Sequence, residues 1–548
     1  MKSVVNSVNA KVNKFPGMTE LSKKIALSRA ITSMRKLFPD EYEFYPRSWF
    51  IPTQFDEFCE YCGSREAINS DDIDHNQQAP VNWYIVKPDD GAQGSGIYLI
   101  NSPSQLKDVT TKQLIQEYVS DPYLMSDLLK FDFRVYAVIK SINPLSIYVA
   151  REGMARFCTE RYHRPTTSNS NNLYAHLTNY SLNKANDHYI HSNSLQDQLR
   201  GSKRLLSTVF RQMEVRGVKT KRLWHDIKLI IVKTILAMVP EIMLCYEHYF
   251  FDAPGPQCFQ IMGFDILVTR QLDPILLEVN SAPSLTIEHS LPVNQEDDLE
   301  NIEPQKIRSV VDEIIKIPLV MDTILLVLNI FDDVYNEPRI STGNVLSDVI
   351  NHEKKPTDDN RLTLNTKKKS RLSEVFEETF QIFPCRYGQC SGHLLFLDKA
   401  VYLFMQFVNL KQTSFMTISG ARTLIKKCNL TNVISTAELE RKFIEVYYHF
   451  TGEQWTTGAC GELKISSCVE IYLLPARLKE RRLSRYQTRS RNDAGRKGRS
   501  RYSHSLPRNI NLSSAAGKNM QSDATTETAK RSKVDRFVLP KIRPPFYV

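Results

Sequence analysis

The spacing of apolar residues divides the first half of the chain into helical and sheet-forming parts. Apolar residues recur at helical spacing from Leu21 to Phe38, from Leu195 to Met213 and from Trp224 to Met243. Short runs rich in branched and aromatic residues predict strands. These runs are Trp83–Val86, Ile97–Ile100, Leu114–Val119, Phe133–Ile139, Leu145–Ala150, Phe259–Val268 and Ile275–Val279. Helices and strands mixed in this order predict an α+β fold with an antiparallel or mixed sheet.

The pattern changes twice beyond residue 335. Residues 336–371 are charged and rich in turn formers, which indicates a linker. Helical spacing then returns, with a capping box at Ser435 to Glu438, and no stretch there has the ligand spacing of a calcium-binding loop. We predict five parts: an N-terminal lobe at 1–80, a core at 81–335, the linker at 336–371, a small helical domain at 372–475, and a disordered basic tail at 476–548.

Composition excludes several classes of protein. The 548 residues are 42% hydrophobic and 24% charged, close to globular averages, so the chain is neither collagen-like nor wholly disordered. Its ten cysteines are scattered, and the close pairs Cys59/Cys62 and Cys385/Cys390 lack the further ligands of a zinc site. This usage fits a reducing, cytoplasmic setting. The longest apolar stretches are shorter than the roughly 18 to 20 residues of a membrane span, so we expect no membrane association.

The net charge of +10 is unevenly distributed. From Arg477 to the C-terminus there are 19 Lys/Arg and 5 Asp/Glu, whereas the rest of the chain is slightly acidic, with 52 basic and 56 acidic residues. The tail is either a solvated or nuclear-localisation segment or a cationic arm for an acidic partner. Nucleic acid is not expected as its partner, because Tyr486 and Tyr502 are too sparse for base stacking.

Two groups of polar residues suggest an anion site. The loop from Lys87 to Gly96 carries three glycines between predicted strands, and its backbone amides could approach phosphates, although a plain glycine-containing hairpin also fits. Lys130, Asp132 and Arg134 fall on one face of a strand. They either line a cleft or form a solvated sheet face, since buried charges without partners are costly.

Carboxylates on two further strands suggest a metal site. Asp265 lies within an apolar strand, and Glu278 and Asn280 share a face of the next strand. Two carboxylates and an amide suit Mg²⁺ held together with nucleotide phosphates, while a buried network of hydrogen-bonded acids is the alternative. Taken with the two cationic groups, this arrangement predicts ATP-dependent chemistry at a sheet-lined cleft.

Six motifs occur along the chain in this order: Asn13–Met18 (NKFPGM), Trp83–Pro88 (WYIVKP), Gln116–Val119 (QEYV), Lys130–Arg134 (KFDFR), His176–Ser181 (HLTNYS) and Leu277–Asn280 (LEVN). Together they resemble the tubulin tyrosine ligase-like family, and its polyglutamylase branch in particular. The resemblance covers about residues 10–330. It implies an ATP-grasp catalytic core, in which two β-rich lobes clamp ATP.

The resemblance also implies roles for the residues at matching positions. Lys87, Lys130 and Arg134 would be catalytic. ATP would contact Lys87, Gln93, Gly94, Gln116, Glu117, Tyr118, Val119, Lys130, Asp132, Thr178 and Asn179. Two Mg²⁺ ions would be held by Asp265, Glu278 and Asn280, and the incoming amino acid by Arg156, Tyr180, Ser181 and Lys203.

The activity implied by the resemblance is ligation of L-glutamate, through an acyl-phosphate, onto glutamate side chains of tubulin C-terminal tails. The partners would be tubulin or microtubules and free glutamate, and the location the cytoskeleton, including cilia or basal bodies. A tubulin glycine or tyrosine ligase, or a microtubule-binding protein with a vestigial ATP site, are the alternatives.

Two departures from the family pattern stand out. Relatives usually carry more β/α sequence before the Phe-Pro-Gly-Met motif, whereas only 14 residues precede Phe15, so we expect an incomplete N-terminal lobe. Ser95 also replaces a basic residue that is frequent in the glycine loop, which would weaken phosphate contacts without abolishing activity.

Overall fold

The computed structural model describes most of the first 331 residues and parts of the remainder. The described residues are 10–71, 82–91, 94–192, 194, 196–250, 255–290, 306–331, 380–383, 407, 415–451 and 462–464. They belong to two compact units: residues 1–414 with 464–466, and residues 415–463 with 467–548. The predicted linker and basic tail lie outside the described residues.

An eight-stranded, mostly antiparallel sheet forms the centre of the first unit. Its strands are β1 (Val12–Asn13), β6 (Leu129–Ile142), β7 (Leu145–Val149), β8 (Met154–Arg161), β9 (Lys203–Leu205), β10 (Cys258–Val268), β11 (Pro274–Asn280) and β14 (Phe380–Phe383). The 14-residue β6 pairs with β7, β8 and β10, while β11 pairs with β10. Only β1 runs parallel to its partner, β10, among the described strands of this sheet.

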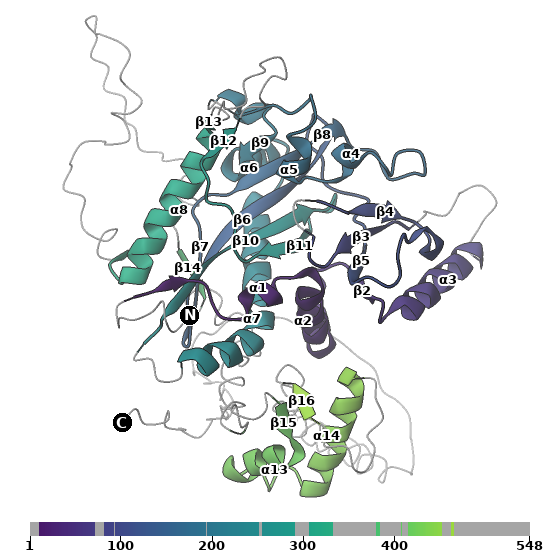
Figure 1. Ribbon diagram of the computed structural model, residues 1–548, viewed down its shortest axis with the longest axis vertical. Helices are drawn as coiled ribbons and strands as arrows, with labels where there is room; N and C mark the ends of the chain where they lie inside the picture. The colour runs from purple at the N-terminus through teal and green to yellow at the C-terminus, as the bar shows by residue number, and fades with distance from the viewer. Residues whose placement is uncertain are drawn as a thin grey trace, which may run out of the picture. The chain divides into compact units, whose positions relative to one another are not determined.

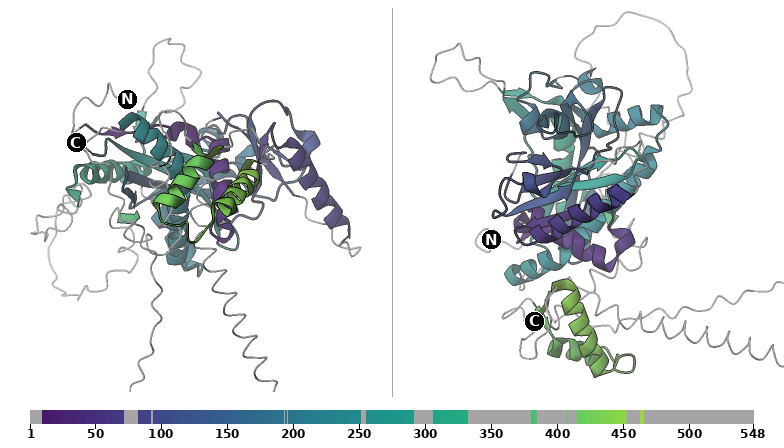
Figure 2. Two further views of the ribbon diagram at one scale, coloured as in Figure 1. Left: turned by 90° about the horizontal axis from the view of Figure 1, so that it is seen from below. Right: turned by 90° about the vertical axis from the view of Figure 1, so that its right-hand side faces the viewer.

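A smaller, four-stranded sheet lies beside the large one (Figure 1, Figure 2). Its order is β2 (Ser48–Ile51), β5 (Gln113–Glu117), β3 (Tyr84–Pro88) and β4 (Tyr98–Ile100). Helix α3 (Phe55–Asp71) covers one face of it, because Phe58 packs against the rings of Trp49 and Tyr84 at centroid distances of 5.1 and 5.0 Å. The two sheets correspond to the two β-rich lobes that the sequence predicts.

Seven further helices are described in the first unit. They are α1 (Met18–Leu21), α2 (Lys24–Leu37), α4 (Leu173–His176), α5 (Tyr180–Asn183), α6 (Leu206–Val215), α7 (Thr220–Phe250) and α8 (Val310–Leu328). Short 3₁₀ turns occur at Pro39–Glu41, Pro103–Gln105 and Gln196–Leu199, and β12 (Glu288–Ser290) pairs with β13 (Lys306–Arg308). Helix α8 packs Val311, Ile315 and Leu319 against the sheet residues Tyr136 and Val138.

Helix α7 is the one described helix that is long and apolar enough to cross a membrane. However, 72% of its most apolar window is buried inside the protein, which is typical of a core helix. Burial of residues such as Ile231 and Leu236 therefore accounts for its apolar character.

The Phe-Pro-Gly-Met motif joins the N-terminal segment to α7. Phe15 and Met18 are fully buried, and the Phe15 ring lies 6.0 Å from that of Tyr246. Gly17 has φ +81° and passes so close to α7 that a Cβ there would lie 2.8 Å from Cys245 Sγ. A residue with a side chain would meet both a backbone strain and a clash, so the motif requires glycine at this position.

The second unit contains a helix–loop–helix and a short sheet. Helices α13 (Ile418–Lys427) and α14 (Thr436–Thr451) are described together with the paired strands β15 (Phe415–Thr417) and β16 (Glu462–Lys464). Ser435 Oγ accepts a hydrogen bond from the Glu438 amide at 3.2 Å, so the predicted cap is present. Leu439 and Phe443 are buried, as the helical spacing predicts.

The predicted strands are all present, but two other predictions need correction. The predicted helix from Leu195 to Met213 is α-helical only from Leu206. A short 3₁₀ turn occupies Gln196–Leu199, and Lys203–Leu205 forms β9, which pairs with Met154–Arg156 of β8. Residues 380–383, which we assigned to the helical domain, pair with β7 in the large sheet. The second compact unit begins at Phe415.

Candidate functional site

A cavity of about 620 Å³ is lined by both sheets of the first unit. The small sheet supplies residues of β3 and β5, and the large sheet supplies residues of β6, β8, β10 and β11. The cavity collects every site residue that the sequence predicts except Gln93 and Lys203. Gln93 lies outside the described residues.

Lys203 lies next to the cavity rather than in its wall. Its Nζ lies 3.9 Å from the centroid of the Tyr180 ring, which does line the cavity. The same Nζ pairs with Asp312 Oδ2 at 3.0 Å, and Lys316 pairs with the other Asp312 oxygen at 2.7 Å. Lys203 therefore contacts a residue of the cavity wall, Tyr180, but does not line the cavity itself.

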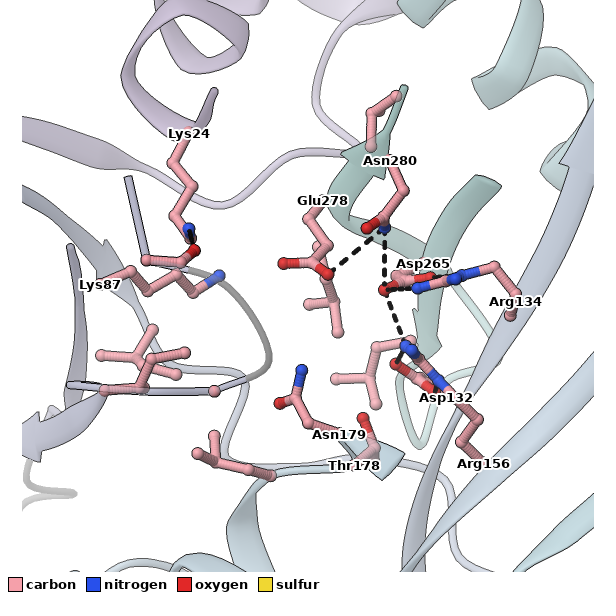
Figure 3. A pocket seen from close by; sticks show the side chains of 18 of the residues that line it. Lys24, Lys87, Asp132, Arg134, Arg156, Thr178, Asn179, Asp265, Glu278 and Asn280 are labelled. Carbon is pink, nitrogen blue, oxygen red and sulfur yellow. Dashed lines mark hydrogen bonds and ion pairs between the residues drawn. The ribbon is translucent and has the colours of Figure 1, made fainter. Parts of the chain in front are cut away.

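Asp265, Glu278 and Asn280 meet because β10 and β11 are paired. Asp265 is directly opposite Glu278 in the antiparallel register. Asn280 Nδ2 lies 3.5 Å from Asp265 Oδ2 and 3.4 Å from Glu278 Oε1 (Figure 3). Burial raises the pKa of Glu278, and the neighbouring Asp265 carboxylate raises it further.

This group fits a hard divalent cation. It offers carboxylate and amide oxygens, the donors that Mg²⁺ prefers, and two adjacent carboxylates are a repulsive pair that a cation would relieve. Asp265 also accepts hydrogen bonds from arginines, yet a carboxylate has about four lone-pair sites, so coordination remains open to it.

Two arginines are paired with buried carboxylates in the same cavity. Arg134 contacts both Asp265 oxygens, with Nη2 to Oδ2 at 2.8 Å. Arg156 Nε donates to Asp132 Oδ1 at 2.9 Å, and its Nη2 lies 2.5 Å from Asp132 Oδ2 and 2.7 Å from Asp265 Oδ2. Burial alone would raise the pKa of Asp265, but Arg134 and Arg156 outweigh burial and hold that pKa well below its ordinary value.

Two lysines of the cavity, Lys87 and Lys130, have neutral partners instead. Lys87 Nζ donates to Gln116 Oε1 at 2.8 Å, and Lys130 Nζ donates to the Tyr118 hydroxyl at 2.7 Å. Burial lowers the pKa of each lysine to about 8. His176 Nδ1 lies 3.0 Å from the Tyr118 hydroxyl, and burial, followed by the Lys130 charge, lowers its pKa to about 4. A neutral His176 can accept the hydrogen bond from the Tyr118 hydroxyl.

Sequence reasoning missed the contribution of the N-terminal segment. Thr19, Ser22, Lys23 and Lys24, around the start of α2, also line the cavity. Lys24 Nζ donates to the Gly91 carbonyl. No spacing rule joins a lysine at a helix start to a loop more than 60 positions away, although Lys23 and Lys24 come only a few residues after the Phe-Pro-Gly-Met motif.

Comparison with known proteins agrees with these features. A family model described as "Tubulin-tyrosine ligase family" matches residues 2–302, and one described as "Tubulin polyglutamylase TTLL11, EF-hand" matches residues 380–484. The second match identifies the predicted helical domain as an EF-hand domain.

Curated relatives are similar over most of this chain. The tubulin polyglutamylase ttll-11 of Caenorhabditis elegans is 57% identical over 458 residues, which cover 84% of this chain and 61% of that protein. Human tubulin polyglutamylase TTLL11 is 37% identical over 477 residues, covering 85% and 62% respectively. The chain thus spans about three fifths of the length of these relatives. Since the first family model covers more than half of its residues, the chain belongs to the tubulin-tyrosine ligase family.

Proposed function

We propose that this protein is an ATP- and Mg²⁺-dependent tubulin polyglutamylase that ligates L-glutamate onto glutamate side chains of tubulin C-terminal tails. One observation carries the proposal: Lys87 and Lys130, which have no acidic partner among the described residues, line the same cavity between two sheets as the carboxylate pair Asp265 and Glu278. The 57% identical relative is a tubulin polyglutamylase, which supports this choice of substrate and product.

The cavity offers distinct places for the parts of ATP. The adenine would lie along the β5 end, at Gln116, Glu117, Tyr118 and Val119, and the phosphates near Lys87, Lys130 and the glycine loop with Gln93 and Gly94. Asp132, Thr178 and Asn179 would complete the nucleotide site. Because Lys87 and Lys130 are bonded to neutral groups, their charge is available to an anion.

Asp265, Glu278 and Asn280 would hold the Mg²⁺ ions, for which we propose two sites. When bound, these ions would neutralise the negative charge on the phosphate oxygens. Arg134 keeps the Asp265 carboxylate in place by its two-oxygen contact and extends the positive wall of the cavity toward the reacting phosphate.

The proposed reaction has two steps, phosphoryl transfer and amide formation. A carboxylate oxygen of the acceptor glutamate attacks the γ-phosphorus, the bond between the γ-phosphorus and the bridging oxygen breaks, and ADP leaves. The amine of L-glutamate then attacks the acyl carbon, loses a proton, and displaces phosphate to leave an amide. Lys87, Lys130 and Arg134 would stabilise the negative charge that develops in the first step.

Arg156 would bind a carboxylate of the incoming glutamate, together with Tyr180, Ser181 and Lys203. Its contacts with Asp132 and Asp265 use Nε and Nη2. Among the described residues no bond to its Nη1 is found, so two N–H donors are left for the substrate. The acidic partners would fix the guanidinium plane before the amino acid arrives.

A ligation assay with microtubules, ATP, Mg²⁺ and radiolabelled amino acids tests the function. Wild-type protein should incorporate glutamate, whereas Glu278→Gln should lower the rate by at least about 100-fold, because it replaces a metal-binding carboxylate. The thermal unfolding of this variant should show that the fold is kept.

Three results would contradict the proposal or redirect it. Incorporation of glycine or tyrosine instead of glutamate would identify a different ligase. Equal rates for wild type and Glu278→Gln would contradict the assigned metal site. Microtubule binding with no incorporation of any amino acid would favour a binding protein with a vestigial site.

A further inference from the structure

The start of α2 is attached to the first arm of the glycine loop. The Ile25 amide donates to Asp89 Oδ1 at 2.9 Å, Lys23 pairs with Asp90 at 2.9 Å, and Lys24 Nζ donates to the Gly91 carbonyl. These contacts join residues more than 60 positions apart in the chain. They place two consecutive lysines at the edge of the cavity.

The two lysines differ in their partners. Lys23 pairs with two exposed carboxylates, Glu20 and Asp90, each at 2.9 Å. Lys24 has no acidic partner in the part of the chain that the structure describes, and its one hydrogen bond there goes to the neutral Gly91 carbonyl. Since an ammonium group has three N–H donors, that bond leaves two for a ligand.

Lys24 and Lys87 lie on the same side of the cavity, across from Glu278 (Figure 3). The charge of Lys24 contributes, after burial, to the low pKa of Lys87, as expected for neighbouring ammonium groups. The hydrogen bond of Lys87 also goes to a neutral group, the Gln116 amide oxygen. Two such cations side by side repel each other, and an anion between them would remove that repulsion.

We propose that Lys24 binds the terminal phosphate of ATP, the group that is transferred, as a further lysine of the active site. The inference rests on the proposed function. Lys24 and Lys87 both face Glu278 at the proposed metal site (Figure 3). The anion that fits between a metal site and two lysines is the end of the triphosphate rather than its nucleoside.

Comparing the affinities for ATP and ADP tests whether Lys24 binds the terminal phosphate or has only a structural role, because ADP lacks that phosphate. We would measure them by competition with a fluorescent nucleotide for the wild type, Lys24→Met, Lys24→Arg and the matched control Lys23→Met. Lys24→Met should weaken ATP binding on the order of 10- to 100-fold and ADP binding by less than about threefold. Lys24→Arg should recover most of the loss, because it restores the charge.

The control should leave both affinities within about threefold of the wild type, because exposed ion pairs such as Lys23–Asp90 contribute little. Equal weakening of ATP and ADP in Lys24→Met would show that Lys24 only anchors the loop, and would overturn the inference. So would unchanged ATP affinity with a raised KM for the tubulin acceptor. A wild type that binds ATP but ligates no glutamate would refute the proposed function and leave this inference standing.

Discussion

At the scale of single residues, the site separates paired from unpaired charges. Arg134 and Arg156 are bonded to Asp132 and Asp265, so part of their positive charge is compensated and their guanidinium planes are held in place. Lys87 is bonded to a neutral oxygen and keeps its charge for a ligand. This division follows from chemistry, since the planar guanidinium matches a carboxylate with two parallel bonds, whereas an ammonium acts as a point charge.

The lowered lysine pKa values predict proton uptake when ATP binds. Burial places the pKa of Lys87 and of Lys130 at about 8, so at pH 8 about half of each is neutral. Phosphate oxygens favour the charged form and raise these pKa values, so binding takes up protons and weakens as the pH rises through 8. Calorimetry of ATP binding in two buffers with different ionisation enthalpies measures the uptake.

A matched variant tests which groups take up the protons. Lys87→Met and Lys130→Met should each remove about half of the uptake at pH 8. Both should be compared at nucleotide concentrations that saturate the variant. Proton release in the wild type, or uptake that both variants retain in full, would contradict the assignment.

At the scale of elements, strand pairing sets which charged side chains of the candidate site lie opposite one another. The β10–β11 register puts Asp265 opposite Glu278, and the β6–β10 register puts Arg134 opposite Asp265. Gly263 of β10 makes room for this arrangement, because a Cβ there would lie 3.0 Å from Arg134 Cδ and 3.2 Å from Pro283 Cβ. With Arg156 from β8, which pairs with β6, the acid–arginine network is a product of four adjacent strands.

The N-terminal motif predicts a stability effect at Gly17. Gly17→Ala should lower the free energy of unfolding by about 2 to 4 kcal/mol, because it adds the strain of a left-handed backbone to a clash with Cys245 Sγ. Urea unfolding measures the change. The double variant Gly17→Ala/Cys245→Ala should lose less free energy of unfolding relative to Cys245→Ala alone. Removing Cys245 Sγ relieves the clash but leaves the backbone strain. An unchanged unfolding midpoint for Gly17→Ala would contradict this account.

The helix–loop–helix of the second unit predicts independence from calcium. Its loop, residues 428–435, contains no Asp or Glu, and the nearby Glu440 is held by Arg422, with Nε at 2.9 Å. Calcium sites of EF-hands need several carboxylate oxygens in the loop. Adding calcium or a chelator should therefore leave the thermal unfolding of the protein unchanged. A calcium-dependent rise in the unfolding temperature would show that residues 380–484 hold an ion after all.

At the scale of the whole molecule, the excess positive charge is concentrated at the C-terminal end of the sequence. The 19 basic and 5 acidic residues from Arg477 onward contrast with a slightly acidic remainder, and this tail lies outside the described residues. Tubulin tails are acidic, so under the proposed function a cationic segment would raise the local concentration of the protein at tubulin.

Removing residues 477–548 should therefore raise the KM for microtubules several-fold at low salt and leave the KM for ATP unchanged. The difference from the full chain should disappear at about 0.3 M salt, because screening removes long-range attraction. A variant that keeps the length but replaces the lysines and arginines by glutamine is the control for charge. Equal KM values at all salt concentrations would assign the tail another role.

The sequence alone predicted the α+β class and seven of the strands, because runs of β-branched residues are local patterns. Polar residues on strand faces also marked Lys130, Asp132, Arg134, Asp265, Glu278 and Asn280 of the cavity wall, whereas the family resemblance supplied residues such as Gln116 and Thr178. The short strand Lys203–Leu205 and the edge strand Phe380–Phe383 were not predicted from the sequence, since a strand of three or four residues is stabilised mainly by pairing with its partner. Tertiary structure decided which charges meet. It placed Arg156 on Asp132 and Asp265, and it brought Lys24 to Gly91. Pairing between distant positions depends on packing in three dimensions, which no local pattern encodes.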